Sequence, residues 1–351
     1  MRAAVVGGGI AGLTAAYHLA DAGTEVTLME AGPVLGGQIR SRSTGGFLIE
    51  EGAEGFPARR TAVTLLCDEL GLCDSLLRQR ARRSFLWRNQ RLEELEPGTA
   101  AARLGLAVEP EDLGSGLVTL REGMGQLVDA LVRRVAGAAE VRLSCPVNRL
   151  RVNRSSWRVG IPGTTVEADA VVLAVPARPM AALLEPELGP LPLLSDLPAG
   201  DSITVTVAVP SSAVTLPENA SGFIADGEGP FRGCSFCSAK FDHRAPEGWE
   251  LIRVFFRPDV TSRQASDQDW IEQAKAILRA SIGLDDREPQ AWISRWEEAL
   301  PRYPAEFSNR AATLTNRVRQ LGRIAVCGSA VTSGGIDGAV RTAKAALAVS
   351  G

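Results

Sequence analysis

The sequence predicts an α/β fold, in which a doubly wound sheet of parallel strands is combined with a smaller, interleaved α+β part containing a mixed sheet. Three observations favour this class. The chain opens on a short apolar run, "MRAAVV", that passes through glycines into a helical pattern. It closes on the same order of elements in "IAVCGSAVTSGGIDGAVRTAKAALAV". Between them, residues 203–257 alternate apolar and polar positions, as strands do. A chain of 351 residues has room for two packed domains or one large one.

A glycine frame follows the first strand directly. Gly7, Gly9 and Gly12 fill the pattern G-x-G-x-x-G, and the helical pattern "LTAAYHLADAG" comes after it. The first glycine permits the tight turn, the second lets the backbone approach a pyrophosphate, and the third lets the helix pack against the strand. The next expected strand, "TEVTLME", ends at Glu30, whose carboxylate would accept hydrogen bonds from a ribose. This context predicts a dinucleotide site, with the phosphates at the helix N-terminus.

The remaining elements follow from local patterns in chain order. Strands are expected at "GGFLIEEGAEGF", in a hairpin at "RSFLWRNQRLEELEPG" with Asn89 near its turn, and at "EVRLSCPVNRLRV", "WRVGI" and "EADAVVLAVP". Helices are expected at "TAVTLLCDELGL", after the glycine turn of "LVTLREGMGQLVDALVRRV", at "QDWIEQAKAILRASIGL" and from about Asp337.

Composition and charge exclude several classes of protein. The net charge of −3 gives no electrostatic footprint for nucleic acid or an anionic membrane. We expect no signal peptide, no membrane span and a cytoplasmic location, because the most apolar long stretch, residues 197–217, contains prolines and alternates like a strand. Cys234 and Cys237 form C-x-x-C in an expected strand, where residues three apart point to opposite faces, so reduced and buried thiols are expected. No metal site is expected, nor a Ser-His-Asp, Cys-His or paired-carboxylate constellation.

Beyond the glycine frame, several segments resemble one enzyme family. "AGPVLGGQIRS" resembles the extension E-x-x-x-x-x-G-G-R-x-x-[ST] of the flavin amine oxidase and porphyrinogen oxidase superfamily, with Gln38 in place of its arginine. "GGFLIEEGAEGFPARR", "LVTLREGMGQLVDAL", "CSFCSAKFDHRAPEGWELIRVFF", "RWEEALPRYP" and "CGSAVTSGGIDGAVRTAKAAL" look like segments of protoporphyrinogen and coproporphyrinogen oxidases. These segments occur in the same order as in the family and cover most of the chain.

The resemblance implies FAD as the cofactor and a set of residues that would contact it. Beside the glycine frame, the pair Gly36 and Gly37 would approach the pyrophosphate from a second side. The loop after "FLIE" would lie near the flavin ring. The C-terminal helix would present N–H groups to the flavin carbonyl edge. The residues that the resemblance implies as FAD contacts are Gly7, Gly9, Ile10, Ala11, Gly12, Glu30, Ala31, Gly36, Gly37, Gln38, Gly52, Ala53, Val147, Ala174, Gly328, Ser329, Gly335 and Ile336.

Three departures from the family concern the substrate pocket. Only "TAAARLGLAVEPEDLGSG" stands where the family has a long helical insert that roofs the pocket and contributes to membrane attachment. The family's terminal "G-N-A-Y-x-G-V-G" reads "GSAVTSGG" here. Glu54 stands where some members have an arginine that binds a substrate carboxylate, and Arg59 and Arg60 follow closely enough to compensate. Trp296 and Tyr303 are candidates for the pocket lining, from the match to "W-x-x-A-L-P-x-Y".

The resemblance therefore implies an FAD-dependent oxidoreductase that dehydrogenates a porphyrinogen-like or other apolar small molecule by hydride transfer to flavin N5, with oxygen as acceptor. An FAD-binding domain would comprise residues 1–60, 118–185 and 320–351, and a substrate domain residues 61–117 and 186–319. Three alternatives stay open: a flavin amine oxidase, although the strand "SITVTVAV" lacks the lysine that those enzymes use; another FAD dehydrogenase of a smaller substrate; and a noncatalytic FAD-binding subunit. A homo-oligomer or a partner subunit could roof the shortened pocket, and no stable membrane insertion is expected.

Overall fold

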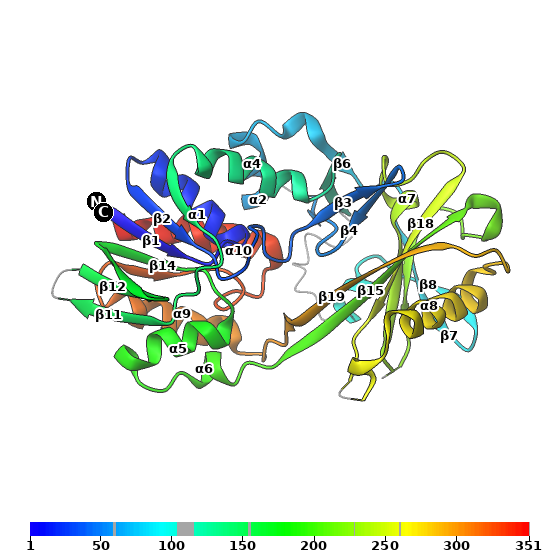
Figure 1. Cartoon of the computed structure of the whole chain (residues 1–351). Helices are drawn as coiled ribbons and strands as arrows, with labels where there is room; N and C mark the ends of the chain where they lie inside the picture. Colours follow the sequence, from blue (N-terminus) through cyan, green and yellow to red (C-terminus); the bar gives the residue numbers. More distant parts are fainter. Residues whose placement is uncertain (59–60, 104–115, 154–155, 228, 260, 351) are drawn as a thin grey trace.

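The computed structural model describes residues 1–58, 61–103, 116–153, 156–227, 229–259 and 261–350. Within them, five parallel strands form one sheet, here called the parallel sheet, in the spatial order β10-β2-β1-β14-β20. Its strands are β10 (Ala139–Arg142), β2 (Glu25–Met29), β1 (Arg2–Val6), β14 (Ala170–Leu173) and β20 (Ile324–Val326). The N- and C-termini lie side by side at the outer end of this half of the molecule (Figure 1).

Both faces of the parallel sheet are covered, which confirms the doubly wound fold class. The first layer consists of helices: α1 (Ile10–Asp21), α4 (Gly125–Ala136), α10 (Gly335–Ala345) and η5 (Ala346–Ser350). The second consists of a three-stranded antiparallel meander and further helices: β11 (Arg149–Asn153), β12 (Ser156–Ile161), β13 (Thr164–Ala168), α5 (Ala177–Leu188), α6 (Pro192–Ser195) and α9 (Phe307–Arg319). Successive residues of a strand point to opposite faces of the sheet and so belong to different cores. Val5 packs with the first layer and Val6 with the second.

A second, mixed sheet of seven strands, here called the large sheet, lies in the other half of the molecule (Figure 1). Its spatial order is β19-β15-β18-β17-β16-β7-β8, and the pairs are antiparallel except for β16 with β7. The strands are β19 (Gln290–Pro301), β15 (Ala199–Pro210), β18 (Trp249–Phe256), β17 (Phe231–Phe236), β16 (Ala220–Ala225), β7 (Arg83–Arg88) and β8 (Arg91–Leu95). The mixed sheet and the β7–β8 hairpin confirm the sequence prediction; Asn89 and Gln90 form its turn with φ of 49° and 57°.

One face of the large sheet is an apolar core, and helix α8 (Asp267–Ile282) covers it. Ile203, Val205 and Val207 of β15 point to this core, where Trp270 and Leu278 of α8 are fully buried. Because strand side chains alternate, the residues between them on β15 point to the opposite face.

Short elements make up the rest of the described secondary structure. They are β3 (Ser41–Thr44), β4 (Phe47–Glu50), β5 (Phe56–Pro57), α2 (Ala62–Glu69), η1 (Cys73–Ser75), β6 (Leu76–Arg78), α3 (Thr99–Arg103), β9 (Leu117–Leu120), η3 (Ser211–Ala213), α7 (Cys237–Lys240) and η4 (Ser262–Gln264). The predicted domain limits stay a prediction. Helices α2 and α9, which that division places in the substrate domain, pack in the cores of the parallel sheet.

The strand predicted around the C-x-x-C motif is wrong at its second cysteine. Strand β17 contains Cys234 but ends at Phe236, and Cys237 begins the short helix α7, whose Phe241 N–H donates to the Cys237 carbonyl. The turn directs Lys240 inward. Both thiols are buried, and this burial raises the pKa of each, so they are protonated and unreactive at neutral pH.

Candidate flavin site and the facing sheet

The parallel strands place the predicted phosphate loop at their common carboxyl edge. Gly7 directly follows β1 with φ of +102°, and its N–H donates to Met29 O at 2.8 Å. Helix α1 then begins at Ile10 with Gly9 as N-cap, and among the described residues no side chain caps this end. Free backbone N–H groups and the positive end of the helix dipole are therefore available for an anion.

The spacing around the glycines accounts for their pattern. A Cβ at Gly12 would lie 1.8 Å from Gly7 O, and one at Gly7 would lie 2.6 Å from Ala174 O. Side chains at these two positions would therefore collide with backbone. A Cβ at Gly9 would have its nearest neighbour, Gly37 Cα, at 4.0 Å, so Gly9 faces open space. Two packing glycines and one open glycine fit a backbone that cradles a pyrophosphate.

Glu30 lies at the end of β2 as predicted. Its Oε2 accepts the Gly8 N–H at 2.6 Å, and its Oε1 accepts the Gly32 N–H at 2.7 Å. The two donors fix the carboxylate beside the phosphate loop. Each carboxylate oxygen has a further lone pair, which can accept a ribose hydroxyl.

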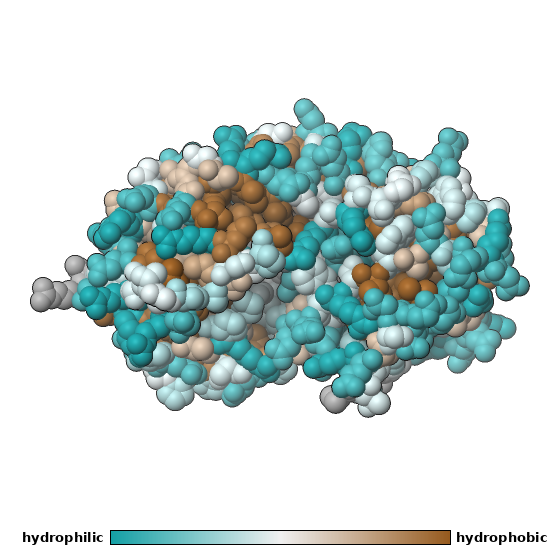
Figure 2. Space-filling model, viewed as in Figure 1, coloured by the Kyte–Doolittle hydropathy of each residue, from teal (hydrophilic) through white to brown (hydrophobic). Residues whose placement is uncertain are grey.

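The structure brings most of the other predicted FAD contacts to the same edge. Gly36 N–H donates to Gly8 O at 2.8 Å, which places the pair Gly36 and Gly37 against the glycine frame that follows β1. Cys145 N–H donates to Glu30 O at 2.8 Å and so holds the segment leading to Val147 near the acid. A Cβ at Gly328 would lie 3.3 Å from Ala11 Cβ. Figure 2 shows apolar residues gathered over the region of α1 and α4, next to the middle of the molecule where the halves meet.

The loop between β4 and β5 carries Gly52 and Ala53 and lies between the two halves. A Cβ at Gly52 would lie 1.6 Å from Gln38 O, so this loop packs tightly against the backbone that directly follows Gly37. From the large sheet, Trp296 Nε1 donates to Glu51 O at 2.7 Å, and Arg253 Nη2 donates to the same oxygen at 3.2 Å. The loop is thus held between the phosphate loop and the large sheet.

The face of the large sheet opposite α8 is polar and buried. It includes Thr204 and Thr206 of β15, Ser235 of β17, Arg253 of β18 and Ser294 of β19, each at most 9% exposed. Two of its polar atoms, Thr204 Oγ1 and Arg253 Nε, are buried without a hydrogen-bond partner within the described part of the chain. Because unsatisfied buried donors are costly, this face fits contact with a polar ligand or with water.

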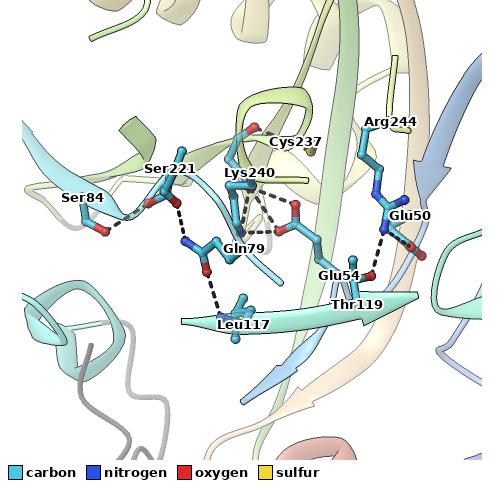
Figure 3. Close-up of polar contacts among 12 residues, drawn as sticks. Glu50, Glu54, Gln79, Ser84, Leu117, Thr119, Ser221, Cys237, Lys240 and Arg244 are labelled. Atoms are coloured by element: carbon cyan, nitrogen blue, oxygen red, sulfur yellow. Dashed lines mark hydrogen bonds and ion pairs between the residues drawn. The ribbon is translucent and has the colours of Figure 1, made fainter. Parts of the chain in front are cut away.

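Glu54 is not a free acid in this region but half of a buried ion pair. Lys240 Nζ donates to Glu54 Oε2 at 2.8 Å, and Ser235 Oγ donates to both carboxylate oxygens at 3.1 Å. Figure 3 shows Glu54 and Lys240 pointing toward one another beside β9. Burial alone would raise the pKa of Glu54, but the charge and hydrogen bond of Lys240 outweigh it and lower the pKa to about 2. The negative charge that the sequence places near the pocket is therefore neutralised by Lys240.

Glu50, at the end of β4, has the opposite titration behaviour. Its carboxylate accepts the Met124 N–H at 2.8 Å and the Ser41 hydroxyl at 2.6 Å, yet burial raises its pKa to about 7. Arg244 approaches it only to 3.8 Å, because the Arg244 guanidinium donates instead to Thr119 Oγ1 at 2.8 Å (Figure 3). A distant cation does not offset the loss of solvation.

The other predicted pocket residues have different surroundings. Trp296 lies on β19 at the Glu51 loop, with the Arg40 guanidinium 5.2 Å from its ring centre. Tyr303 instead packs in the second core of the parallel sheet, and its hydroxyl donates to Ser329 O at 3.0 Å. Arg59 lies outside the described residues.

The sequence reasoning missed Lys240, Ser235 and Arg253. Arg253 had a detectable signal, a charge in the middle of the apolar strand "ELIRVFF". Within the described ranges, no three His, Cys, Asp or Glu side chains are grouped so as to hold a metal ion. No helix in those ranges is long and apolar enough to cross a membrane.

Comparison with known proteins adds the family context. The model of the family "Flavin containing amine oxidoreductase" matches residues 10–110 and 98–347. A coproporphyrinogen III oxidase from Propionibacterium freudenreichii is 32% identical over 64% of this chain, but that match spans only 43% of the relative. The coproporphyrinogen III oxidase of Mycobacterium leprae is 29% identical, with 85% of this chain and 87% of the relative covered.

A third relative shows that the lengths differ. The coproporphyrinogen III oxidase of Mycobacterium bovis is 26% identical over 440 aligned positions, with 98% of this chain and 96% of the relative covered. Because the alignment is longer than the 351 residues of this chain, the relative has internal segments that this chain lacks. This difference agrees with a short family member.

Solved structures share the fold. A candidate protoporphyrinogen oxidase from Exiguobacterium sp. 255-15 has a TM-score of 0.85 at 21% identity, with 99% of this chain and 98% of that chain covered. Cyclohexylamine oxidase from Brevibacterium oxydans IH-35A has a TM-score of 0.77 at 16% identity, with the same coverage.

Proposed function

The chain belongs to the flavin-containing amine oxidoreductase family, and from that premise we propose that it dehydrogenates a porphyrinogen-like or other apolar small molecule, with molecular oxygen as the electron acceptor. The chain is an oxidoreductase with FAD as its cofactor. The observation that carries the proposed substrate class is the match to coproporphyrinogen III oxidases over most of the chain.

The residues at the carboxyl edge of the parallel sheet would hold the cofactor. Gly7, Gly9 and Gly12 with the start of α1 would bind the pyrophosphate, and Glu30 would accept the ribose hydroxyls. Gly335 and Ile336 at the start of α10 would present N–H groups and a positive helix end to the flavin carbonyl edge. Bound FAD supplies the hydride acceptor, so the protein's contribution is to orient the substrate and exclude water.

The polar face of the large sheet would perform these two tasks. Trp296 and Arg253 fix the Glu51 loop, and Lys240 fixes Glu54, so the loop is held by the same sheet that the substrate would contact. A site held by side chains of a rigid sheet keeps its geometry during the reaction.

The roof of the pocket is the part for which this chain differs from its relatives. A short segment stands in place of the family's helical insert. It begins with α3, and the following residues 104–115 lie outside the described part of the chain. We propose that the isolated chain turns over free protoporphyrinogen IX poorly, and that a second copy or a partner subunit completes the site.

The test is anaerobic reduction of the purified, FAD-loaded protein. Coproporphyrinogen III, protoporphyrinogen IX and a panel of amines are added separately, and the loss of flavin absorbance near 450 nm is followed. We expect bleaching by a porphyrinogen and not by amines. Bleaching by amines alone would establish the amine oxidase alternative, and bleaching by none of them would favour a noncatalytic subunit.

A further inference from the structure

Three arginines gather at the end of the large sheet nearest to the parallel sheet. Arg232 is the extra residue where the register of β17 shifts between Phe231 and Gly233, and Arg257 directly follows β18. Arg302 directly follows β19. A Cβ at Gly200 of β15 would lie 3.8 Å from Arg257 Cδ and 3.7 Å from Arg302 Nη2, so both side chains border this glycine. Figure 1 shows the start of β15 and the end of β19 together where the two halves meet.

No acidic side chain among the described residues balances the positive charges of these arginines. Within the described ranges, none of the three makes an ion pair, and the only side-chain hydrogen bond among them is from Arg232 to Gly227 O at 3.1 Å. The Nε atoms of Arg232 and Arg257 are buried without a partner in the same residues. Burial, and then the charges of Arg232 and Arg302, lower the pKa of Arg257. Three guanidinium groups with unused donors form a site for an anion.

Two nearby acidic side chains have other partners. Asp201 forms an ion pair with Arg263 at 2.6 Å and accepts the Glu298 N–H at 2.9 Å. Asp226 forms an ion pair with Arg88. These two acids therefore already have partners and do not balance the charge of the three arginines.

The arginines continue the polar face that holds the Glu51 loop. Arg253, Phe255 and Arg257 are alternate residues and so share one face of the β18 segment, and the Arg253 guanidinium lies 4.9 Å from the Phe255 ring centre. The four residue steps from Arg253 to Arg257 span about 13 Å along the strand. A molecule with an apolar body over Phe255 could therefore reach from the Glu51 loop to the arginines.

We propose that Arg232, Arg257 and Arg302 bind a carboxylate group at the edge of the substrate. The carboxylate pairs with the three guanidinium groups, while the apolar body of the substrate lies along Phe255 toward the Glu51 loop. The identity of the ligand rests on the proposed function, whereas the anion site itself rests on the arginines. The three arginines thereby act as specificity-determining residues for an acidic substrate.

The first experiment compares coproporphyrin III with its tetramethyl ester, which has the same ring but no charge. Binding to the FAD-loaded protein is measured by quenching of flavin fluorescence in wild type, Arg257→Gln and Arg302→Gln. The control is Arg279→Gln, which removes an exposed positive charge from the α8 side of the sheet. We expect Arg257→Gln and Arg302→Gln each to raise the Kd of the acid about tenfold, and neither to change that of the ester. Equal loss for acid and ester, or no loss for the acid, would overturn the proposal.

The second experiment is independent of the porphyrin ring. The thermal midpoint is measured with sodium citrate, at an ionic strength matched with NaCl. Citrate should stabilise wild type and Arg279→Gln but not Arg257→Gln. If neither ring compound binds and citrate still distinguishes the variants, the porphyrinogen assignment fails and the anion site stands. If citrate stabilises all variants equally, the anion site is refuted.

Discussion

Replacing Lys240 by methionine should change both the stability of the protein and its pH dependence. The pKa of Glu54 is about 2 in the folded chain against an ordinary 4.5, and each unit corresponds to about 1.4 kcal/mol, so the ionised Glu54 in its folded surroundings, with Lys240, Arg253 and Ser235 together, contributes about 3 kcal/mol. Because this pKa is lowered on folding, the contribution is present above pH 4.5 and is lost as the pH falls toward 2. Lys240→Met leaves a buried carboxylate without its cation, and we expect a loss of about 3 kcal/mol at pH 7.

The assay is guanidinium denaturation of the FAD-loaded protein, followed by circular dichroism between pH 4.5 and 8. In Lys240→Met the pKa of Glu54 should rise above 4.5, so the stability should increase as the pH falls. Lys344→Met is the matched control, because Lys344 forms a shorter but exposed pair with Glu69, at 2.6 Å, and should cost less than about 1 kcal/mol. The double variant Lys240→Met/Glu54→Gln should recover most of the loss. A double variant as unstable as the single one would refute the role of the buried charge.

Three further predictions concern Glu50 and the phosphate loop. Burial raises the pKa of Glu50 to about 7, so the folded state holds its proton longer than the unfolded chain, and stability should fall by up to about 3 kcal/mol between pH 4.5 and 7. Urea midpoints at pH 5 and 8 should differ less in Glu50→Gln than in wild type. Gly12→Ala, with a Cβ 1.8 Å from Gly7 O, should lose bound flavin and folded yield, measured by the ratio of absorbance at 450 and 280 nm, whereas Gly137→Ala should keep both. Glu30→Ala should weaken FAD binding at least tenfold, measured by recovery of free FAD fluorescence; unchanged retention would contradict the assigned ribose contact.

Local patterns were sufficient for the elements that form from neighbouring residues. The order of β1, the glycine frame and α1 depends on a stretch of about twenty residues, and Glu30 follows because parallel strands end at one edge. The turn of the β7–β8 hairpin is similarly local, since Asn89 tolerates a positive φ.

Pairings between segments distant in the sequence could not be predicted from local patterns. Strand β7 pairs with β16 in parallel, where Ser84 is matched with Gly222, 138 residues further along, and no periodicity within either strand specifies its neighbour. The ion pair of Glu54 and Lys240 spans 186 residues. It also depends on the change of direction at Cys237, where strand β17 ends and the chain continues as the short helix α7.

The order of strands in both sheets has a consequence for synthesis on the ribosome. Arg83–Leu95, the β7–β8 hairpin, emerges more than a hundred residues before its neighbour Ala220–Ala225, so its inner edge has no sheet partner during that interval. The two sheets receive their last strands, Gln290–Pro301 and Ile324–Val326, only near the end of translation. Long-range pairing of this kind slows folding and exposes open strand edges to aggregation. Folding yield should therefore depend on the supply of chaperones during synthesis.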